Sequence, residues 1–115
     1  MPLSDNQSRV RIRELNDNFR KTLDPTLGRL VLTAGVDTLP SDVRAMAIRK
    51  VATFEAFGGD NDPHEEHDFG AFDADGQRVL FKIDYFDESL SYHSTDPADP
   101  SVTKRVITIM LAEEY

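Results

Sequence analysis

Residues 69–86 read FGAFDADGQRVLFKIDYF and predict an antiparallel β-hairpin. Asp75-Gly76 is a strong signal for a two-residue hairpin turn, because both central residues of that turn need a positive φ. After the turn, apolar residues alternate strictly with a mixed set, which is typical of a strand with one buried face. We therefore expect a hairpin of 69–73 with 78–86, and a core face made of Val79, Phe81, Ile83 and Tyr85.

Two helices and a strand are expected before the hairpin. Ser4 and Gln7 form a capping box, and Ile12, Leu15, Phe19 and Leu23 then recur at helical spacing up to Asp24-Pro25. Residues 29–34 are a short β-prone run that ends at Gly35. Pro40 suits the first turn of a second helix, with a stripe of Val43, Ala47, Val51, Phe54 and Phe57 and an end at Gly58-Gly59.

Two further elements are expected after the hairpin. Residues 90–94 suit a short fourth strand, and Asp99-Pro100 suits the start of a last helix whose apolar stripe is Val102, Val106, Ile109 and Met110. The expected fold is a single α+β domain over residues 1–115. It has three helices packed on a mostly antiparallel sheet of about four strands, in the order α-β-α-β-β-β-α.

Composition excludes several classes of protein. The chain of 115 residues has no cysteine, which rules out disulfides, thiolate metal sites and cysteine nucleophiles. Its polar N-terminus does not have the apolar run of a signal peptide, and no stretch reaches the ~20 apolar residues of a membrane span. We expect a cytoplasmic protein that does not contact a membrane.

Charge is distributed unevenly along the chain. Residues 1–50 hold nine Lys and Arg against six Asp and Glu (+3), and residues 51–115 hold four against fifteen (−11). The resulting net charge of −8 disfavours binding to phosphate backbones, even though the first helix carries several arginines. An acidic surface instead favours a protein partner with a basic surface.

The densest chemistry lies in residues 60–68, DNDPHEEHD. Two readings stay open for this segment. His64 and His67 are spaced to face one divalent metal ion in a helical turn, with nearby carboxylates as further ligands. The His-x-x-His spacing is not the zinc-protease motif, however, and the calcium-loop pattern is broken. The other reading is a protein-contact surface in the acidic region 60–99, with candidate contacts at Asp60, Asp62, His64, Glu65, Glu66, His67, Asp68 and Asp84.

Asp84 is a second candidate, because it lies mid-strand with Lys82 two residues away on the same face. Such a pair is either an acid–base couple with shifted pKa values or an ordinary ion pair on a half-exposed sheet. No catalytic residue can be assigned from the sequence. The nucleophile elbow of serine hydrolases and the glycine-rich phosphate loops are both missing.

Several segments resemble one family of small bacterial proteins that is catalogued only as a domain of unknown function. They are Arg13–Asp17, Gly28–Val36, Asn61–Gly70, Lys82–Tyr85, Asp96–Pro100 and Val106–Ala112. The resemblance implies a stand-alone bacterial domain that is frequently encoded on plasmids and other mobile elements, and it implies no catalytic residues.

Together these observations predict a small acidic protein-interaction domain, acting as an accessory or inhibitory factor of a mobile genetic element. In its strongest form, the acidic surface would imitate nucleic-acid charge and block a basic cleft. The alternative is a small metal-dependent enzyme that uses His64, His67 and neighbouring carboxylates. The first reading requires no cofactor, and the second requires a divalent metal.

Overall fold

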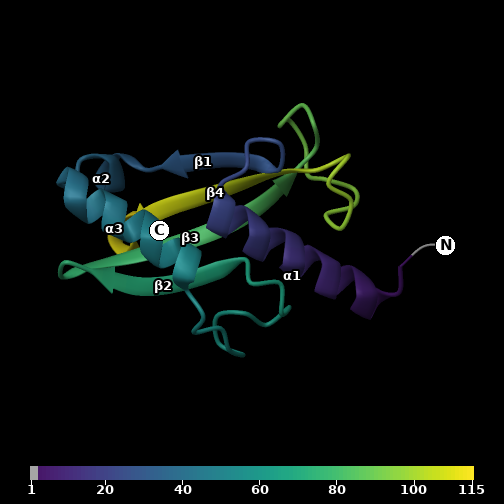
Figure 1. The fold of residues 1–115 in the computed structure, drawn as a ribbon, viewed down its shortest axis with the longest axis horizontal. Coiled ribbons are helices and arrows are strands. Elements are labelled where there is room, and N and C mark those ends of the chain that lie inside the picture. Colours follow the sequence, from purple (N-terminus) through teal and green to yellow (C-terminus); the bar gives the residue numbers. More distant parts are fainter. Residues whose placement is uncertain (1–2) are drawn as a thin grey trace.

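The computed structural model describes residues 3–115, and a four-stranded sheet lies at its centre (Figure 1). The strands are β1 (Gly28–Leu32), β2 (Phe69–Ala74), β3 (Gln77–Phe86) and β4 (Lys104–Leu111). Their order in the sheet is β1-β4-β3-β2. β1 pairs parallel to β4, and the other two pairings are antiparallel. The predicted α+β class with a mostly antiparallel sheet is confirmed.

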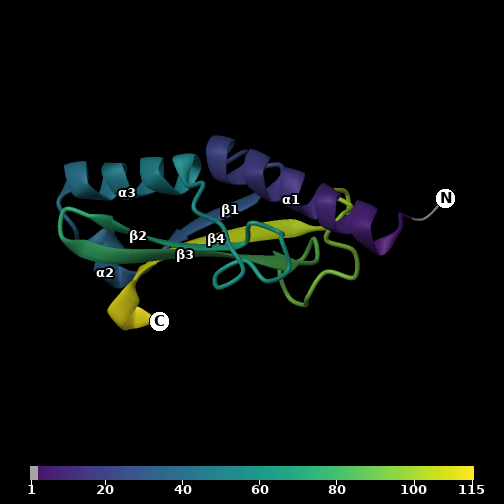
Figure 2. The ribbon, with the colours of Figure 1, turned by 90° about the horizontal axis from the view of Figure 1, so that it is seen from below.

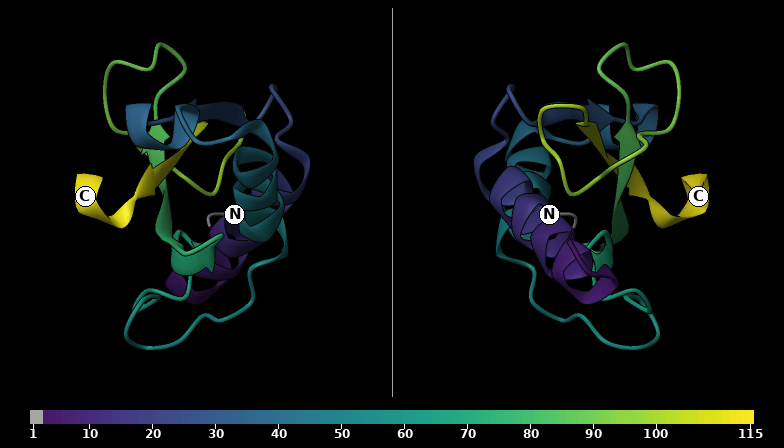
Figure 3. Two further views of the ribbon diagram at one scale, coloured as in Figure 1. Left: turned by 90° about the vertical axis from the view of Figure 1, so that its left-hand side faces the viewer. Right: turned by 90° about the vertical axis from the view of Figure 1, so that its right-hand side faces the viewer.

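Helices cover the two faces of the sheet unequally. α1 (Asp5–Thr22) and α3 (Ser41–Thr53) lie along one face, and Figure 2 shows them as a single layer. The short α2 (Ala34–Asp37) and the 3-10 turn η1 (Ala112–Glu114) lie on the opposite side. The end-on views in Figure 3 show the C-terminal segment separated from α1 and α3 by the strands. The main core therefore lies between the sheet and the α1–α3 layer.

The hairpin forms as predicted. Its register pairs Ala74 with Gln77, and Asp75 and Gly76 adopt φ values of 50° and 78°, as the tight turn requires. Val79, Phe81, Ile83 and Tyr85 all belong to the buried core cluster. Phe81 is fully buried, and its ring meets the edge of Phe54 at a centroid distance of 5.5 Å.

The predicted α1 is also confirmed. Ser4 caps it, and the reciprocal hydrogen bonds between Ser4 and Gln7 complete the capping box. Leu23 ends the helix in the left-handed conformation, with φ 51°, ahead of Asp24-Pro25. Ile12, Leu15 and Phe19 are buried against the sheet, as their spacing indicates.

The last predicted helix is wrong: residues 104–111 form the central strand β4. Ile107, Ile109 and Leu111 face the core, where they pair with Ile83, Phe81 and Val79 of β3. Val106 and Met110, which were expected in the core, lie on the other face of the sheet. The β-branched run Val106-Ile107-Thr108-Ile109 favours a strand, since such side chains pack well on a pleated surface.

Two smaller expectations are also corrected. Residues 90–94 make no strand, and they join the sheet only by an isolated bridge between Phe86 and His93 and by packing of the His93 ring near Tyr85, within the described residues. Asp87 accounts for this, because its carboxylate accepts hydrogen bonds from Ser91 and Ser89 and closes a turn there. α3 begins after Pro40 as expected but ends at Thr53, before Gly58-Gly59. β1 likewise ends at Leu32, and α2 follows it.

Candidate functional site

The acidic segment 60–68 is partly built into the fold, because Asp62 is buried while Asp60, His64 and Glu65 are exposed. It runs between α3 and β2 and lies against α1 (Figure 1). The side chain of Asp62 is 4% exposed, and its Oδ1 accepts a hydrogen bond of 3.0 Å from the backbone N–H of His67. This bond closes a compact loop in which Glu65 and His67 both adopt a φ of 58°.

His67 lies between two carboxylates. Its Nδ1 is 2.9 Å from Oδ1 and 3.1 Å from Oδ2 of Asp17 on α1. Its Nε2 is 3.7 Å from Oδ2 of Asp62, which is beyond ordinary hydrogen-bond length. An ionised carboxylate only accepts hydrogen bonds, so the proton on Nδ1 points at Asp17. The Nδ1 contact fixes the imidazole ring and leaves Nε2 as the second functional atom.

Arg20 holds the far side of this arrangement. It is 2% exposed, and its Nε and Nη2 donate to Asp17 at 3.1 and 3.0 Å. Its Nη1 donates to the carbonyls of Val51 and Ala52 at the end of α3, which have no partner within that helix. The ring of Phe57 stacks on His67 at a centroid distance of 3.9 Å. α1, the end of α3 and the acidic segment therefore meet at one cluster.

A second polar network is buried beside the first. Asn16, with 0% exposure, donates from Nδ2 to the carbonyl of Glu66 at 3.0 Å and to Oη of Tyr85 at 2.8 Å. Its Oδ1 accepts from Nε of Arg105 at 2.7 Å, and Tyr85 donates to Oε1 of Glu66 at 2.8 Å. Burial raises the pKa of the Tyr85 phenol and lowers the pKa of the Arg105 guanidinium. The network ties α1, the acidic segment, β3 and β4 together.

The residues proposed from the sequence do not all converge. Asp62, Glu66 and His67 join the two networks, whereas Asp60, His64 and Glu65 are exposed. Asp68 is half-buried, and this burial, with the charge of Glu66 as a smaller contribution, raises its pKa. Asp84 forms a half-exposed ion pair with Lys82 at 3.0 Å, on β3 where Ile83 N–H donates to the Asp68 carbonyl, and this pair joins neither network.

The histidines are not arranged as the metal reading requires. Within residues 3–115, no group of three or more His, Asp or Glu side chains is placed to hold a metal ion. His64 points outward while His67 is fixed between Asp17 and Asp62. This geometry does not favour the metal-dependent enzyme considered from the sequence.

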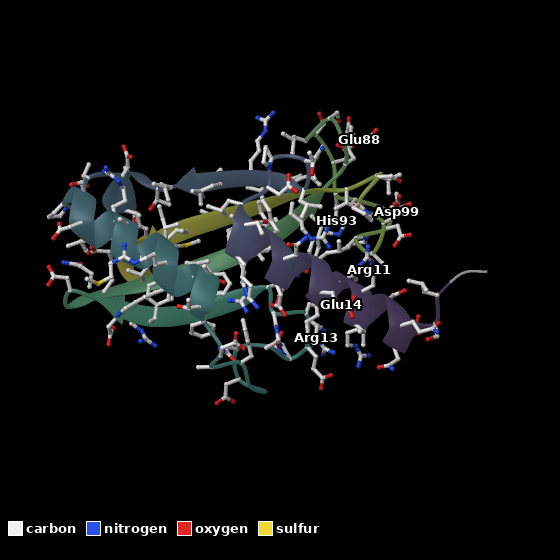
Figure 4. The ribbon with its side chains drawn as sticks, viewed as in Figure 1. Arg11, Arg13, Glu14, Glu88, His93 and Asp99 are labelled. Atoms are coloured by element: carbon white, nitrogen blue, oxygen red, sulfur yellow. The ribbon has the colours of Figure 1, made fainter. Side chains whose placement is uncertain are left out.

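A cavity of about 300 Å³ opens beside His67. Asp62, Glu65, Phe57 and Pro63 line it together with His67, Gly58, Gly59 and Arg13. Arg13 extends from α1 toward this loop, as Figure 4 shows, and its Nη1 donates to the carbonyl of Glu65 at 3.3 Å. The cavity thus combines two carboxylates, one imidazole and one guanidinium with an aromatic wall.

A different surface, which we call the acidic end, is formed by Asp87–Val102 between β3 and β4. It contains Asp87, Glu88, Asp96 and Asp99, and no Lys or Arg occurs from residue 83 to residue 103. Figure 4 shows Glu88, His93 and Asp99 at this end of the molecule. Tyr92 is 75% exposed there and Val102 is 38% exposed. Both line a groove of about 450 Å³ with Asp87, Glu88, Ser89, His93 and Thr95.

Sequence reasoning missed Asn16, Asp17, Arg20 and Arg105. One signal was present, because Asn16 and Arg20 follow Ile12 at successive steps of four and so fall on the apolar stripe of α1. Polar residues at stripe positions indicate a buried polar contact, since burial without a partner is costly. No local signal connects Asp17 to His67, which are far apart in the sequence and meet only in the folded chain.

The helices give no evidence of membrane insertion: among residues 3–115, none combines the length and the apolar character that a span requires. No curated protein and no solved structure matches the chain. One family model does match, over residues 32–114, which is more than half of the chain, and it is described as "Protein of unknown function (DUF3768)". The resemblance inferred from the sequence is thereby confirmed, and the chain belongs to the DUF3768 family.

Proposed function

We propose that this protein is an interaction module that binds a basic protein surface through the acidic end, Asp87–Val102. The observation that carries the proposal is the exposed Tyr92 within a stretch that has acidic side chains and no Lys or Arg. Tyrosine is enriched at protein interfaces, where its ring supplies contact area at a small entropic cost. Carboxylates around an aromatic anchor attract and orient a basic partner.

The acidic end is ordered before any partner arrives. The carboxylate of Asp87 accepts hydrogen bonds from Ser89 and Ser91, which lower its pKa. Further along the acidic end, the carboxylate of Asp99 accepts hydrogen bonds from the hydroxyl and the N–H of Ser101, which also lower its pKa. Ordered loops lose less conformational entropy on binding than flexible ones do. This geometry supports a preformed contact surface.

We place the contact surface in Asp87–Val102, at the far end of the acidic region 60–99 expected from the sequence, rather than in residues 60–68. There, Asp62 and Glu66 are committed to internal hydrogen bonds, and Glu65 lies 3.9 Å from Arg9 of α1. The basic helix thus offsets much of the acidic segment's charge. At the acidic end, Arg105 donates to the Pro97 carbonyl and Arg11 of α1 lies near Ala98, but within the described residues neither forms an ion pair with Glu88, Asp96 or Asp99.

The family resemblance suggests a biological role for this interaction. Relatives of this kind are expected on plasmids and other mobile elements, where an acidic module would act as an accessory or inhibitory factor. A basic cleft that normally receives nucleic acid is a suitable partner, because its Lys and Arg side chains would meet Glu88, Asp96 and Asp99.

The test uses a dye-labelled lysine-rich peptide as the basic probe, with fluorescence anisotropy read at low and at high salt. Glu88→Lys should weaken binding several-fold at low salt and less at high salt, because screening removes the charge contribution. Tyr92→Ala should weaken binding by about tenfold at both salt concentrations, as expected for an aromatic anchor. Its side chain makes no hydrogen bond in the described chain, so the fold should be retained.

The matched control is Glu113→Lys, an equal charge change on η1, far from the acidic end. It should leave binding almost unchanged. Equal weakening by Glu88→Lys and Glu113→Lys, with no effect of Tyr92→Ala, would show only nonspecific attraction to an acidic protein. That result would contradict the proposal.

A further inference from the structure

We propose that the cavity beside His67 binds a small molecule that carries both a primary amine and a carboxylate, such as a free amino acid. The cavity lies between α1 and the segment 57–67, and it shares no lining residue with the groove of the acidic end. The inference is therefore independent of the protein-interaction function proposed above.

The amine is assigned from two hydrogen-bond acceptors that face each other. In the tautomer that carries its proton on Nδ1, where it faces Asp17, the imidazole of His67 presents Nε2 as an acceptor. Oδ2 of Asp62 lies 3.7 Å away and receives no hydrogen bond from the residues the structure describes, although this side chain is only 4% exposed. An ammonium group donates in several directions and can satisfy both acceptors at once. Its charge would also offset the buried carboxylate.

The carboxylate is assigned from Arg13, which lines the same cavity. The single hydrogen bond that its side chain makes within residues 3–115 is the one of 3.3 Å from Nη1 to the carbonyl of Glu65. The guanidinium has five N–H donors, so it keeps donors for a ligand carboxylate, which it can bind in a two-pronged geometry. Arg20 is not available for this role, because it is committed to Asp17, Val51 and Ala52.

The remaining walls suit the body of such a ligand. Phe57 and Pro63 provide apolar surface. Gly58 and Gly59 leave open space, since a Cβ added at either position would meet nothing within 4 Å. A cavity of about 300 Å³ is at the small end of ligand sites. The site thus favours a small ligand that carries a positive and a negative group on the same molecule.

The experiment titrates the ¹⁵N-labelled full chain with three probes of similar shape and follows amide shifts by NMR. L-Leucine carries both groups, 3-methylbutylamine carries only the amine, and 4-methylpentanoate carries only the carboxylate. We expect saturable shifts at Gly58, Gly59 and His67 with leucine, weaker ones with the amine, and none with the carboxylate. The side-chain ¹⁵N signals of His67 should move at Nε2 and stay constant at Nδ1.

Three variants connect the shifts to named atoms. Asp62→Asn keeps an acceptor for the backbone N–H of His67 but removes the negative charge. It should weaken the binding of leucine by at least about tenfold. Arg13→Gln should lower the affinity for leucine to the affinity that wild type has for 3-methylbutylamine. Asp60→Asn, an equal charge change on the exposed side of the same loop, should have no effect.

Three results would overturn the proposal. The first is the absence of saturable shifts with both amines at millimolar concentration in the wild-type protein, whose folding is not in question. The second is equal binding of 4-methylpentanoate and 3-methylbutylamine, which would indicate apolar contact only. The third is unchanged leucine affinity in a folded Asp62→Asn variant.

Discussion

Replacement of Asn16 by alanine should destabilise the protein strongly, although the residue is a small polar side chain on a helix. The change removes the only hydrogen-bond acceptor that Arg105 Nε has among residues 3–115. The Arg105 side chain is 0% exposed, so water cannot replace that acceptor. Losing a hydrogen bond to a buried charged group costs about 1.5–3 kcal/mol, and the orphaned Glu66 carbonyl adds about 1 kcal/mol. Alanine returns about 0.5 kcal/mol through its helix propensity. The net loss is about 2–3.5 kcal/mol.

Urea unfolding followed by circular dichroism measures this loss as a change in the free energy of unfolding. For a domain of this size the melting temperature should fall by about 8–14 °C. Asn18→Ala is the matched control, because Asn18 lies on the same helix, is exposed and makes no side-chain hydrogen bond within the described residues. It should stay within about 0.5 kcal/mol of wild type. A loss below about 1 kcal/mol for Asn16→Ala would refute the network as a stabilising feature.

Three further predictions concern the core and the acidic segment. Phe81→Ala should cost about 3–5 kcal/mol in urea unfolding, because the ring is fully buried, and a loss below about 1 kcal/mol would contradict its place in the core. Gly28→Ala should lower the melting temperature by several degrees, because its Cβ would strike the Arg105 carbonyl on the neighbouring strand, whereas Gly59→Ala should not. Burial raises the pKa of Asp68, which means that the folded state tolerates the neutral carboxyl better than the ionised one. The folded state therefore loses stability as the pH rises through the raised pKa and Asp68 ionises. Asp68→Asn should therefore be more stable than wild type at about pH 7 and lose that advantage below about pH 3, and an advantage that persists in acid would contradict this reasoning.

The hairpin was predictable because its signals are local. Asp75-Gly76 fixes the turn, and the alternation from Val79 to Tyr85 fixes which face is buried. The strand β4 was not predictable in this way, because the spacing of Val102, Val106, Ile109 and Met110 also matches the period of a helix. Its true core face includes Arg105, and an arginine at a buried position interrupts the apolar alternation that identifies strands. Tertiary contacts of that arginine, with Asn16 and the Pro97 carbonyl, explain its burial.

The sequence shows which polar and charged side chains residues 60–68 contain, but not how they are arranged. Composition indicates that His67 and its neighbours are reactive groups, and the cavity beside His67 is consistent with that. Which groups face each other depends on α1, since Asp17, Arg20 and Arg13 reach the segment only after the chain folds. The spacing of His64 and His67 presumes a helical turn, whereas the loop has positive φ at Glu65 and His67 and separates the two rings.

The most direct test of the account is to map where a basic probe contacts the protein. The ¹⁵N-labelled full chain would be titrated with the lysine-rich peptide, and the perturbed amides would be assigned by NMR. The account predicts that the shifts concentrate in Asp87–Val102, with Tyr92 among the largest, and that Asp60–Asp68 changes little. Shifts that concentrate in Asp60–Asp68 and leave Tyr92 unmoved would contradict it.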